Sequence, residues 1–257
     1  MQTNFSPEQL ANPAIAHSEQ ILRKCVHCGF CTATCPTYVE LGDELDSPRG
    51  RIYLIKQMLE GGKPATKETV KHIDRCLSCL SCMSTCPSGV NYMHLVDHAR
   101  AHIDRTYTRH LADRLIRQLL MYVLPDPKRF RLALNASKLG KPLAGVFNAI
   151  PGLQPIAAML ALAPASVPAK TPTWSPGVFA ASSKCKGRVA LLTGCAQPVL
   201  NPGINEATVD LLSRLGIEVV VARGAGCCGA LTHHMGKEEV ARRQARINVD
   251  AWMREIE

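Results

Sequence analysis

The chain has 257 residues, of which 46% are hydrophobic and only 5% aromatic, with a formal net charge of +9. This length allows one large domain or two smaller ones with a packed core. The twelve cysteines are clustered, and Met1 to Gln20 lack the basic start and apolar run of a secretory signal. A disulfide scaffold therefore lacks its usual context, and metal binding in a reducing, cytoplasmic compartment is expected.

The first part of the chain, residues 1–108, is predicted to be a helical domain. Ser6-Pro7 and Ser47-Pro48 each place a capping residue before a proline at the first helical position. The pattern of caps and apolar residues predicts four helices, which run from Pro7 to Lys24, from Pro48 to Gly61, from about Thr66 to Arg75, and onward from Asn91. The cysteine runs of this part then lie in short loops between helices.

The second part, residues 109–185, is predicted to be a helical and proline-rich connector. Leu111 to Leu124 has the apolar spacing of a helix, with Leu115, Leu119 and Tyr122 on one face. Residues 143–167 are apolar but interrupted by prolines, so no piece reaches the roughly 20 residues that cross a bilayer. Two interpretations stay open for this stretch: a packed or partner-covered linker, or a peripheral contact with the inner face of the cytoplasmic membrane.

The third part, residues 186–257, is predicted to be a smaller α/β domain. A buried type of strand from Arg188 to Thr193 is followed by a helix over 201–215 and a second strand over 217–221. This strand–helix–strand order predicts a parallel pair of strands. A charged helix is expected from Gly236 to the end. The fold class is therefore mainly α with a smaller α/β part.

Eight cysteines of the first part form two runs with the same spacing, C-x2-C-x2-C-x3-C-P. The first run holds Cys25, Cys28, Cys31 and Cys35, and the second holds Cys76, Cys79, Cys82 and Cys86. This spacing is typical of bacterial ferredoxins, because three thiolates two residues apart can curl around one [4Fe–4S] cluster while the fourth points away. The repeat predicts two such clusters and the transfer of single electrons.

In two-cluster ferredoxins the fourth cysteine of each run binds the other cluster. We therefore predict two ligand sets, which are Cys25, Cys28, Cys31 and Cys86 for cluster 1, and Cys76, Cys79, Cys82 and Cys35 for cluster 2. The alternatives are a pair of zinc sites, which usually use C-x2-C pairs far apart, and clusters with a purely structural role. Inside the first run, His27 is interpreted as a loop residue or as a group that tunes a cluster.

A different cysteine pattern occurs in the third part. Cys195 ends the first predicted strand, and Cys227 and Cys228 follow the second strand between two glycines. Because ligands bind beyond the carboxyl ends of parallel strands, we expect these three cysteines to converge on a further, incomplete metal site. His233 and His234 are interpreted as helix-surface residues, and Cys185 as a bystander in the connector.

A formal net charge of +9 can indicate a protein that binds nucleic acid. Two clusters, each with a charge of about −2, would lower the balance to about +5. No basic run alternates with aromatic residues, so a basic docking face for an acidic partner is favoured and nucleic acid is not expected as a partner.

These residues resemble a known family. The run from Cys25 to Tyr38, the segment from Gly42 to Lys56 and the second quartet resemble the iron–sulfur subunit of bacterial glycolate oxidase. The wider group includes subunits of anaerobic glycerol-3-phosphate dehydrogenase, lactate-utilisation proteins and heterodisulfide reductases. The resemblance implies an α-helical ferredoxin domain followed by a cysteine-rich "CCG" domain. In that family a C-x2-C pair follows the CCG motif, and the sequence stops at Glu257 before it, as expected of a C-terminally truncated member with a partial CCG domain.

The resemblance also implies a function. The enzyme of that family oxidises glycolate to glyoxylate, an oxidation of a CH–OH group, with FAD carried by partner subunits. This chain lacks a dinucleotide fingerprint and a nucleophile triad, so its expected work is to relay electrons from the flavin subunits to a quinone-type acceptor. The alternatives are the equivalent subunit of a lactate or glycerol-3-phosphate dehydrogenase and a heterodisulfide reductase-like subunit with thiol chemistry at the CCG site.

Overall fold

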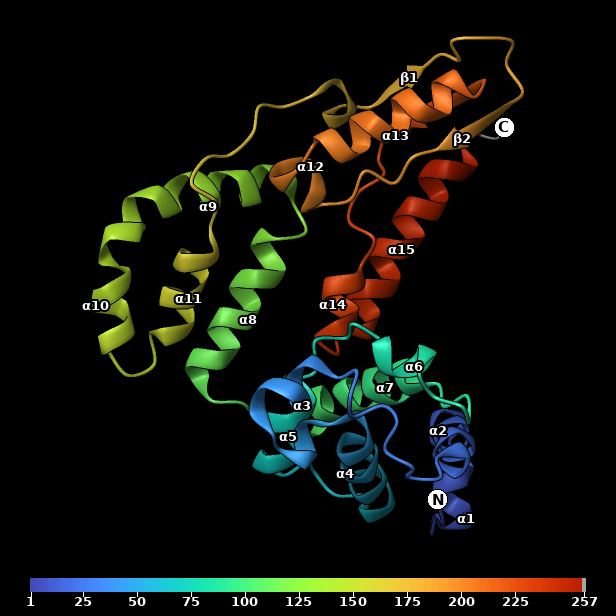
Figure 1. The fold of residues 1–257 in the computed structure, drawn as a ribbon, viewed down its shortest axis with the longest axis vertical. Coiled ribbons are helices and arrows are strands. Elements are labelled where there is room, and N and C mark those ends of the chain that lie inside the picture. Colours follow the sequence, from blue (N-terminus) through green and yellow to red (C-terminus); the bar gives the residue numbers. More distant parts are fainter. Residues whose placement is uncertain (256–257) are drawn as a thin grey trace. The chain divides into compact units, whose positions relative to one another are not determined.

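The computed structural model describes residues 1–255 and confirms the predicted fold class. Helices dominate, and a three-stranded sheet is present (Figure 1). The chain forms two compact units: residues 1–109 with 232–238, and residues 110–231 with 239–257. The predicted domain boundaries at 108 and 185 stay a prediction. Within the described residues, no helix is both long enough and apolar enough to cross a bilayer.

The first unit consists of short and medium helices joined by loops. In chain order these are α1 (Pro7–Leu10), α2 (Pro13–Lys24), α3 (Pro36–Leu41), the 3-10 turn η1 (Glu44–Asp46), α4 (Pro48–Gly61), α5 (Lys67–Asp74), α6 (Ser81–Ser84) and α7 (Tyr92–Thr106). One helix was predicted from Pro7 to Lys24, and the structure divides it. The side chain of Asn12 accepts a hydrogen bond from the backbone of Ala14, and Pro13 starts a new helix.

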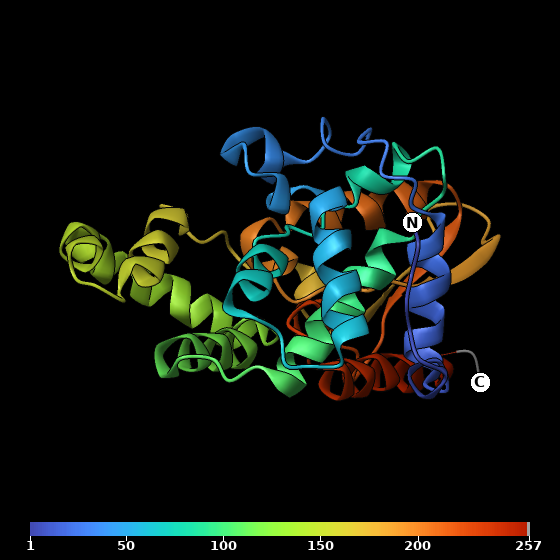
Figure 2. The ribbon, with the colours of Figure 1, turned by 90° about the horizontal axis from the view of Figure 1, so that it is seen from below.

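The core of the first unit lies between α2, α4, α5 and α7, whose packing can be followed in Figure 2. Ile55, Leu59, Ile73, Leu95 and Ile103 are almost completely buried there. Burial of each such side chain stabilises the fold by about 1.5–3 kcal/mol. The core therefore fixes α4 and α7, and both helices begin beside the cysteine loops.

A close backbone contact sets the start of α4. A Cβ atom at Gly50 would lie 2.1 Å from the carbonyl oxygen of Glu44 in η1. The hydroxyl of Ser47 accepts a hydrogen bond of 2.9 Å from the backbone of Gly50 and caps the helix. Glycine is required here because no larger residue leaves room for η1, and η1 carries the buried Asp46.

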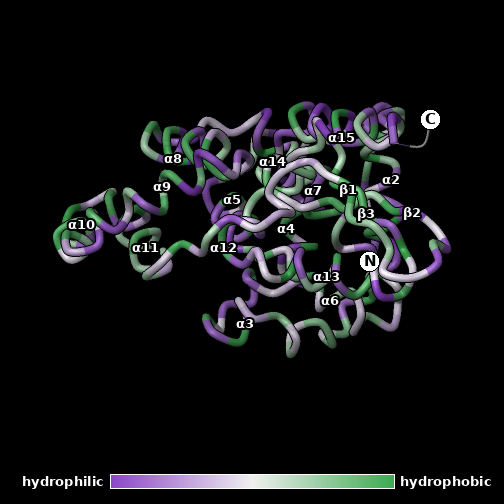
Figure 3. Tube along the Cα trace, turned by 90° about the horizontal axis from the view of Figure 1, so that it is seen from above, coloured by the Kyte–Doolittle hydropathy of each residue, from purple (hydrophilic) through white to green (hydrophobic). Residues whose placement is uncertain are grey.

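The connector of the second unit is more helical than the sequence predicted. The expected helix is α8 (Leu111–Val123), and it is followed by α9 (Pro127–Gly140), the 3-10 turn η2 (Lys141–Leu143), α10 (Ala144–Ala149) and α11 (Gln154–Leu162). Hydrophobic and hydrophilic residues alternate along α8 (Figure 3). Its predicted apolar face, Leu115, Leu119 and Tyr122, is exposed.

The sheet of the second unit has the strand order β1-β3-β2. The predicted strand–helix–strand unit is present as β2 (Gly187–Ala190), α13 (Gly203–Arg214) and β3 (Ile217–Val221), and β2 pairs parallel to β3 as predicted. A third strand, β1 (Gly177–Phe179), was missed and pairs antiparallel with β3. The prediction of a buried first strand was wrong, because β2 is an edge strand with Arg188, Val189 and Ala190 exposed, whereas the central β3 is largely buried.

The remaining elements follow the sheet. They are the turn η3 (Pro172–Trp174) before β1, α12 (Gln197–Leu200) between β2 and α13, and α14 (Ala230–His234) and α15 (Glu238–Met253) after β3. The last of these is the predicted charged helix. Residues 232–238 belong to the first unit, where Lys237 pairs with Asp104 at 2.7 Å and both His233 and His234 contact the Asp97 carboxylate.

Candidate metal centre

The two cysteine runs have the same backbone course. His27 and Ser78, which precede the second cysteine of each run, both have a positive φ, 57° and 52°. The residues after the second cysteine, Gly29 and Leu80, also have positive φ angles of 86° and 59°. Three non-glycine residues in this rarely populated region indicate loops held in shape by their surroundings. The spacing of the cysteines thus builds two matching loops.

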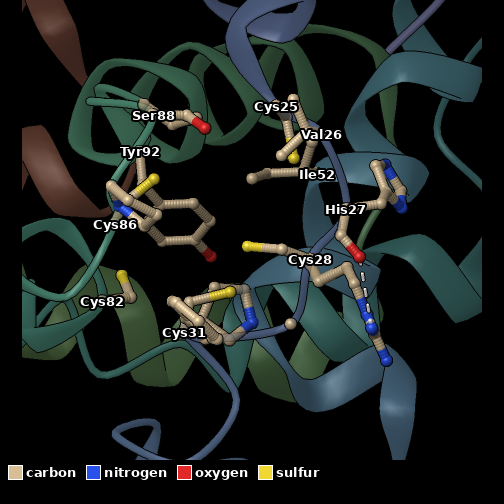
Figure 4. A pocket seen from close by; sticks show the side chains of 16 residues that line it. Cys25, Val26, His27, Cys28, Cys31, Ile52, Cys82, Cys86, Ser88 and Tyr92 are labelled. Carbon is tan, nitrogen blue, oxygen red and sulfur yellow. Dashed lines mark hydrogen bonds between the residues drawn. The ribbon is translucent and has the colours of Figure 1, made fainter.

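The first pocket is lined by cysteines of both runs. Its empty volume is about 450 Å³, and its cysteines are Cys25, Cys28, Cys31, Cys82 and Cys86. Figure 4 shows their sulfur atoms around this space, with the ring of Tyr92 at its border. Four of the five are the ligand set predicted for cluster 1. Burial raises the pKa of the Cys31 thiol.

The second pocket has an empty volume of about 300 Å³ and is lined by Cys35, Cys76, Cys79 and Cys82. These four are the ligand set predicted for cluster 2. Cys35 precedes Pro36, the first residue of α3, and is the N-cap of that helix. A hydrogen bond from the backbone of Ser81 lowers the pKa of Cys79.

The two pockets share several lining residues. Cys82, Pro48 and Tyr92 line both of them. Burial, followed by the neighbouring Cys76, raises the pKa of the Cys82 thiol to about 12. Pro48 and Tyr92 are the first residues of α4 and α7. The positive ends of two long helix dipoles therefore lie beside the pockets and favour a negatively charged group there.

A group of buried charges lies behind the second pocket. The Asp46 carboxylate is fully buried and contacts Arg51 at 3.3 Å, His72 at 2.9 Å and Arg75 at 2.7 Å. Burial opposes ionisation of Asp46, but the hydrogen bonds from His72 and Arg75 outweigh it and lower the pKa of the carboxyl. Arg51 is 1% exposed and reaches the sulfur of Cys35.

The cysteines of the second unit form a different arrangement. The sulfur atoms of Cys195 and Cys227 lie 3.6 Å apart, so the predicted convergence of these two residues is observed. The hydrogen bond between them lowers the pKa of Cys227 to about 6 and raises that of Cys195. The backbone of Gly229 also donates to the Cys227 sulfur at 3.5 Å and favours its thiolate. Cys228 is exposed.

Other sequence-predicted residues have defined places. His27 is half-buried, its carbonyl accepts a hydrogen bond from Arg49 at 3.4 Å, and the residue is part of the lining of the first pocket. Cys185 is exposed, and its thiol donates to the carbonyl of Gly187. Sequence reasoning missed Arg51, Asp46 and Tyr92. The two charged residues lie in the Gly42–Lys56 segment that carries the family resemblance, which was the available signal, whereas Tyr92 had none.

The donor set fits iron–sulfur chemistry, because thiolates are the ligands of iron–sulfur clusters. A family model described as 4Fe-4S dicluster domain matches residues 21–90. A second model, described as cysteine-rich domain, matches residues 189–256. The chain therefore joins a 4Fe-4S dicluster domain to a cysteine-rich domain. These matches identify an iron–sulfur protein and cover both regions in which the sequence predicted metal sites.

The predicted family resemblance is also confirmed. This iron–sulfur protein is 44% identical over 257 residues, its whole length, to the glycolate oxidase iron-sulfur subunit of Escherichia coli (strain K12), and covers 58% of that protein. It is 32% identical over 241 residues to the probable glycolate oxidase iron-sulfur subunit of Bacillus subtilis (strain 168), covering 90% of this chain and 54% of the relative.

A more distant match spans a shorter region. The chain is 29% identical over 76 residues, 27% of its length, to the succinate dehydrogenase iron-sulfur subunit of Paracoccus denitrificans, of which it covers 29%. No solved structure matches the chain. Because the chain spans little more than half of the two glycolate oxidase relatives, the activity and partners of a whole subunit are proposals for it.

Proposed function

We propose that this chain binds two [4Fe–4S] clusters and relays single electrons from a flavin-containing subunit of glycolate oxidase to a quinone-type acceptor. The observation that carries this proposal is the division of eight cysteines between two pockets, each of which combines residues of both runs. The names of the relatives support glycolate as the substrate of the complex. In this proposal the chain contributes no substrate site, and FAD belongs to its partners.

The proposed ligands follow the pockets. Cys25, Cys28 and Cys31 bind cluster 1 together with Cys86, and Cys76, Cys79 and Cys82 bind cluster 2 together with Cys35. Cys82 lines both pockets, and its assignment to cluster 2 rests on the spacing of the second run. A [4Fe–4S] cluster supplies one-electron chemistry, which converts the two-electron oxidation at a flavin into single steps.

The residues of the chain have clear tasks in such a relay. Tyr92 separates the pockets with a buried ring, and its hydroxyl donates to the sulfur of Cys76 at 3.6 Å. Ile52 and Val90 add apolar lining to the first pocket and limit the access of water. The starts of α4 and α7 stabilise negative charge there. The lining residues that the pockets share support neighbouring positions for the two proposed clusters, as sequential electron transfer needs.

The cysteine-rich domain is proposed as a further but incomplete site. Cys195 and Cys227 are in contact and Cys228 is exposed, so three thiols from two loops are available. A fourth ligand would have to come from outside this set. We assign no step of the relay to this site.

Purification without oxygen tests the proposal. The full chain should contain about eight iron atoms on the two-cluster count and, after reduction, show EPR signals of two interacting centres. With the flavin-containing partners, glycolate should then reduce a dye through this chain, whereas lactate and glycerol 3-phosphate should not. A colourless protein that holds zinc, or iron that glycolate never reduces in the complex, would contradict the proposal.

A further inference from the structure

Arg51 is a large, almost completely buried charged side chain beside the candidate ligands. It lies in the first turn of α4 and is 1% exposed. Its guanidinium donates to the carbonyl of His72 at 2.7 Å, to the hydroxyl of Thr37 at 3.0 Å and to the carboxylate of Asp46 at 3.3 Å. The remaining nitrogen, Nη1, lies 3.8 Å from the sulfur of Cys35. The side chain is therefore held on three sides and presents its fourth side to a candidate ligand.

The charged residues around Arg51 fix the orientation of its guanidinium group. Asp46 neutralises part of its charge, and the same carboxylate is held by His72 and Arg75. Asp43 lies 4.0 Å from the other ring nitrogen of His72 and is 41% exposed. Because the Asp46 carboxylate accepts from Nη2, Nη1 is the guanidinium nitrogen that donates to the Cys35 sulfur. Its field on that sulfur is little screened, since both Arg51 and Asp46 are buried.

Thr37 provides a second contact to the same sulfur. Its hydroxyl lies 3.2 Å from the Cys35 sulfur and 2.9 Å from the carbonyl of Asp46. In the free thiol, the Cys35 proton can also be donated to that carbonyl, 3.6 Å away. A Cys35 thiolate has no proton to donate and can only accept. Arg51 already donates to Cys35, and with a bound ligand thiolate the single Thr37 hydroxyl proton would turn from the Asp46 carbonyl toward the sulfur.

The first pocket has no counterpart of this arrangement. Arg49, on the same helix turn, reaches the carbonyl of His27 at 3.4 Å and pairs with Glu44 at 2.7 Å, with 33% of its side chain exposed. Among residues 1–255, no lysine or arginine side chain is hydrogen-bonded to the sulfur atoms of the cluster 1 set, which are those of Cys25, Cys28, Cys31 and Cys86. The Cys31 sulfur accepts from the backbone N–H of Arg49, whose guanidinium also interacts with it electrostatically. The two proposed clusters thus differ in whether a buried arginine side chain is hydrogen-bonded to a ligand sulfur.

We propose that Arg51 is a positioning residue that raises the reduction potential of the cluster held by Cys35 above that of the other cluster. A hydrogen bond and a positive charge at a ligand sulfur favour the reduced, more negative form of a cluster. Tyr92, which donates to Cys76 of the same set, acts in the same direction. Electrons that arrive at cluster 1 then move downhill to cluster 2. This inference rests on the proposed function, because it presupposes both clusters.

EPR-monitored redox titration of the full chain, purified without oxygen, tests the inference. The signal of cluster 2 is first identified as the one altered by Cys35→Ser. Arg51→Lys keeps the charge but loses the fork of donors. In this variant the equilibrium constant for reduction of cluster 2 should fall at least tenfold, which equals 59 mV for one electron. Thr37→Val removes one hydroxyl with little change in shape, and in this variant the same equilibrium constant should fall about threefold. The cluster 1 signal should shift less in both variants.

Two controls separate this contact from general loosening. Arg75→Gln breaks the other arm of the Asp46 group without removing a contact to sulfur, and Arg49→Gln changes a charge beside the first pocket. Neither should move the cluster 2 potential as far as Arg51→Lys does. If the Arg51→Lys protein does not retain cluster 2, the cluster 2 potential of Thr37→Val tests the inference instead.

The outcomes separate the two proposals. Full iron content with unchanged cluster 2 potentials in both test variants would overturn the inference and leave the proposed function standing. An equal shift in Arg75→Gln would also overturn it, since the charge of the whole group would then be responsible. Wild-type protein with about four irons or fewer would instead refute the proposed pair of clusters.

Discussion

The two cysteine regions of this chain differ in how their thiols are prepared for metal. In the first unit, burial raises the pKa of Cys31 and Cys82, so these thiols hold their protons until a metal displaces them. In the second unit, a neighbouring thiol and a backbone N–H lower the pKa of Cys227 to about 6. In the first region only Cys28 and Cys79 of the eight cysteines are exposed, whereas the second region pairs the buried Cys227, with its lowered pKa, with the half-buried Cys195.

This difference follows from the way each region is built. The first region takes its ligands from two loops that the core fixes between α2, α4 and α7. The second takes them from two loops after the strands of a small sheet, and one of these strands is an exposed edge. A cage formed by two fixed loops suits a cluster that keeps its potential, and the lowered pKa of Cys227 suits a thiol that reacts as a thiolate. The four predictions below test this contrast.

The largest expected effect concerns the crossed ligands. Cys35→Ser should remove the cluster whose other ligands are Cys76, Cys79 and Cys82, and Cys86→Ser should remove the other one. Each variant should lose about half of the iron on the two-cluster count, because a cluster with three thiolates is unstable. Iron analysis and EPR of the remaining signal measure this loss.

The exposed Cys185 provides the matched control, and Cys185→Ser should retain all of the iron. If Cys35→Ser instead lost the cluster bound by Cys25, Cys28 and Cys31, each run would hold its own cluster, and the crossed assignment would be wrong.

The sequence was sufficient for the first region because its information is local. The eight cysteines have a fixed spacing, and a proline follows each run. This pattern predicted the two loops and the cysteines that line both pockets, but not the other lining residues. The buried Arg51 and Asp46 were not found, because charged residues are expected at the surface and only the packing of η1 against α4 buries them. Their partners His72 and Arg75 are distant in sequence.

The second large effect concerns the packing that positions the cage. Gly50→Ala should lower the free energy of unfolding by about 3 kcal/mol or more, since its Cβ would lie 2.1 Å from the Glu44 carbonyl and push η1 away from α4. Urea unfolding followed by far-UV circular dichroism measures this change.

Gly61, at the other end of α4, is the control position. No atom lies within 4 Å of a Cβ built there, so Gly61→Ala should raise the stability by up to about 1 kcal/mol through helix propensity. Equal stability of the two variants would show that the contact between η1 and α4 carries no strain and that the cage tolerates movement of its base.

The second unit was harder to predict because its structure depends on long-range pairing. Strand β1 pairs with β3 across some forty residues, and nothing in the local pattern of Gly177 to Phe179 marks it as a strand. The connector helices α10 and α11 were missed because the prolines of residues 143–167 were interpreted as interruptions, whereas Pro155 lies in the first turn of α11. No element was predicted for α9, which begins at Pro127. The meeting of Cys195 and Cys227 was predicted, since parallel strands bring their ends together.

The third prediction uses acid to weaken the first unit. His98 of α7 is buried and hydrogen-bonded to Ser18 of α2 at 2.6 Å. Burial lowers the pKa of His98 from 6.5 to about 4, so the unfolded chain binds a proton that the folded chain excludes. The resulting stability is present above pH 6.5 and is lost as the pH falls toward 4, by up to about 3 kcal/mol.

Unfolding free energies measured between pH 7.5 and pH 5 test this slope. His98→Asn carries no titratable ring, so its stability should be lower at pH 7.5 but should fall less steeply on acidification, at equal iron content. Parallel slopes for wild type and variant would assign the acid sensitivity to other groups, such as His94, whose pKa burial also lowers.

The smallest effect concerns the reactivity of the Cys227 thiol in the second unit. In metal-free chain, alkylation of Cys227 by iodoacetamide should rise with pH to a plateau and be half-maximal near pH 6, because the thiolate is the reacting form and the pKa of Cys227 is about 6. At pH 7 its rate should be about threefold that of Cys227 in Cys195→Ala, because the larger thiolate fraction outweighs the lower nucleophilicity of a more acidic thiol. Mass spectrometry of the modified peptide gives both rates.

A half-maximal pH near 8.5 in wild-type protein would remove the contrast between the two regions, since Cys227 would then behave as an ordinary thiol. In the first region, alkylation of Cys31 and Cys82 should stay slow until high pH, because burial raises the pKa of both thiols.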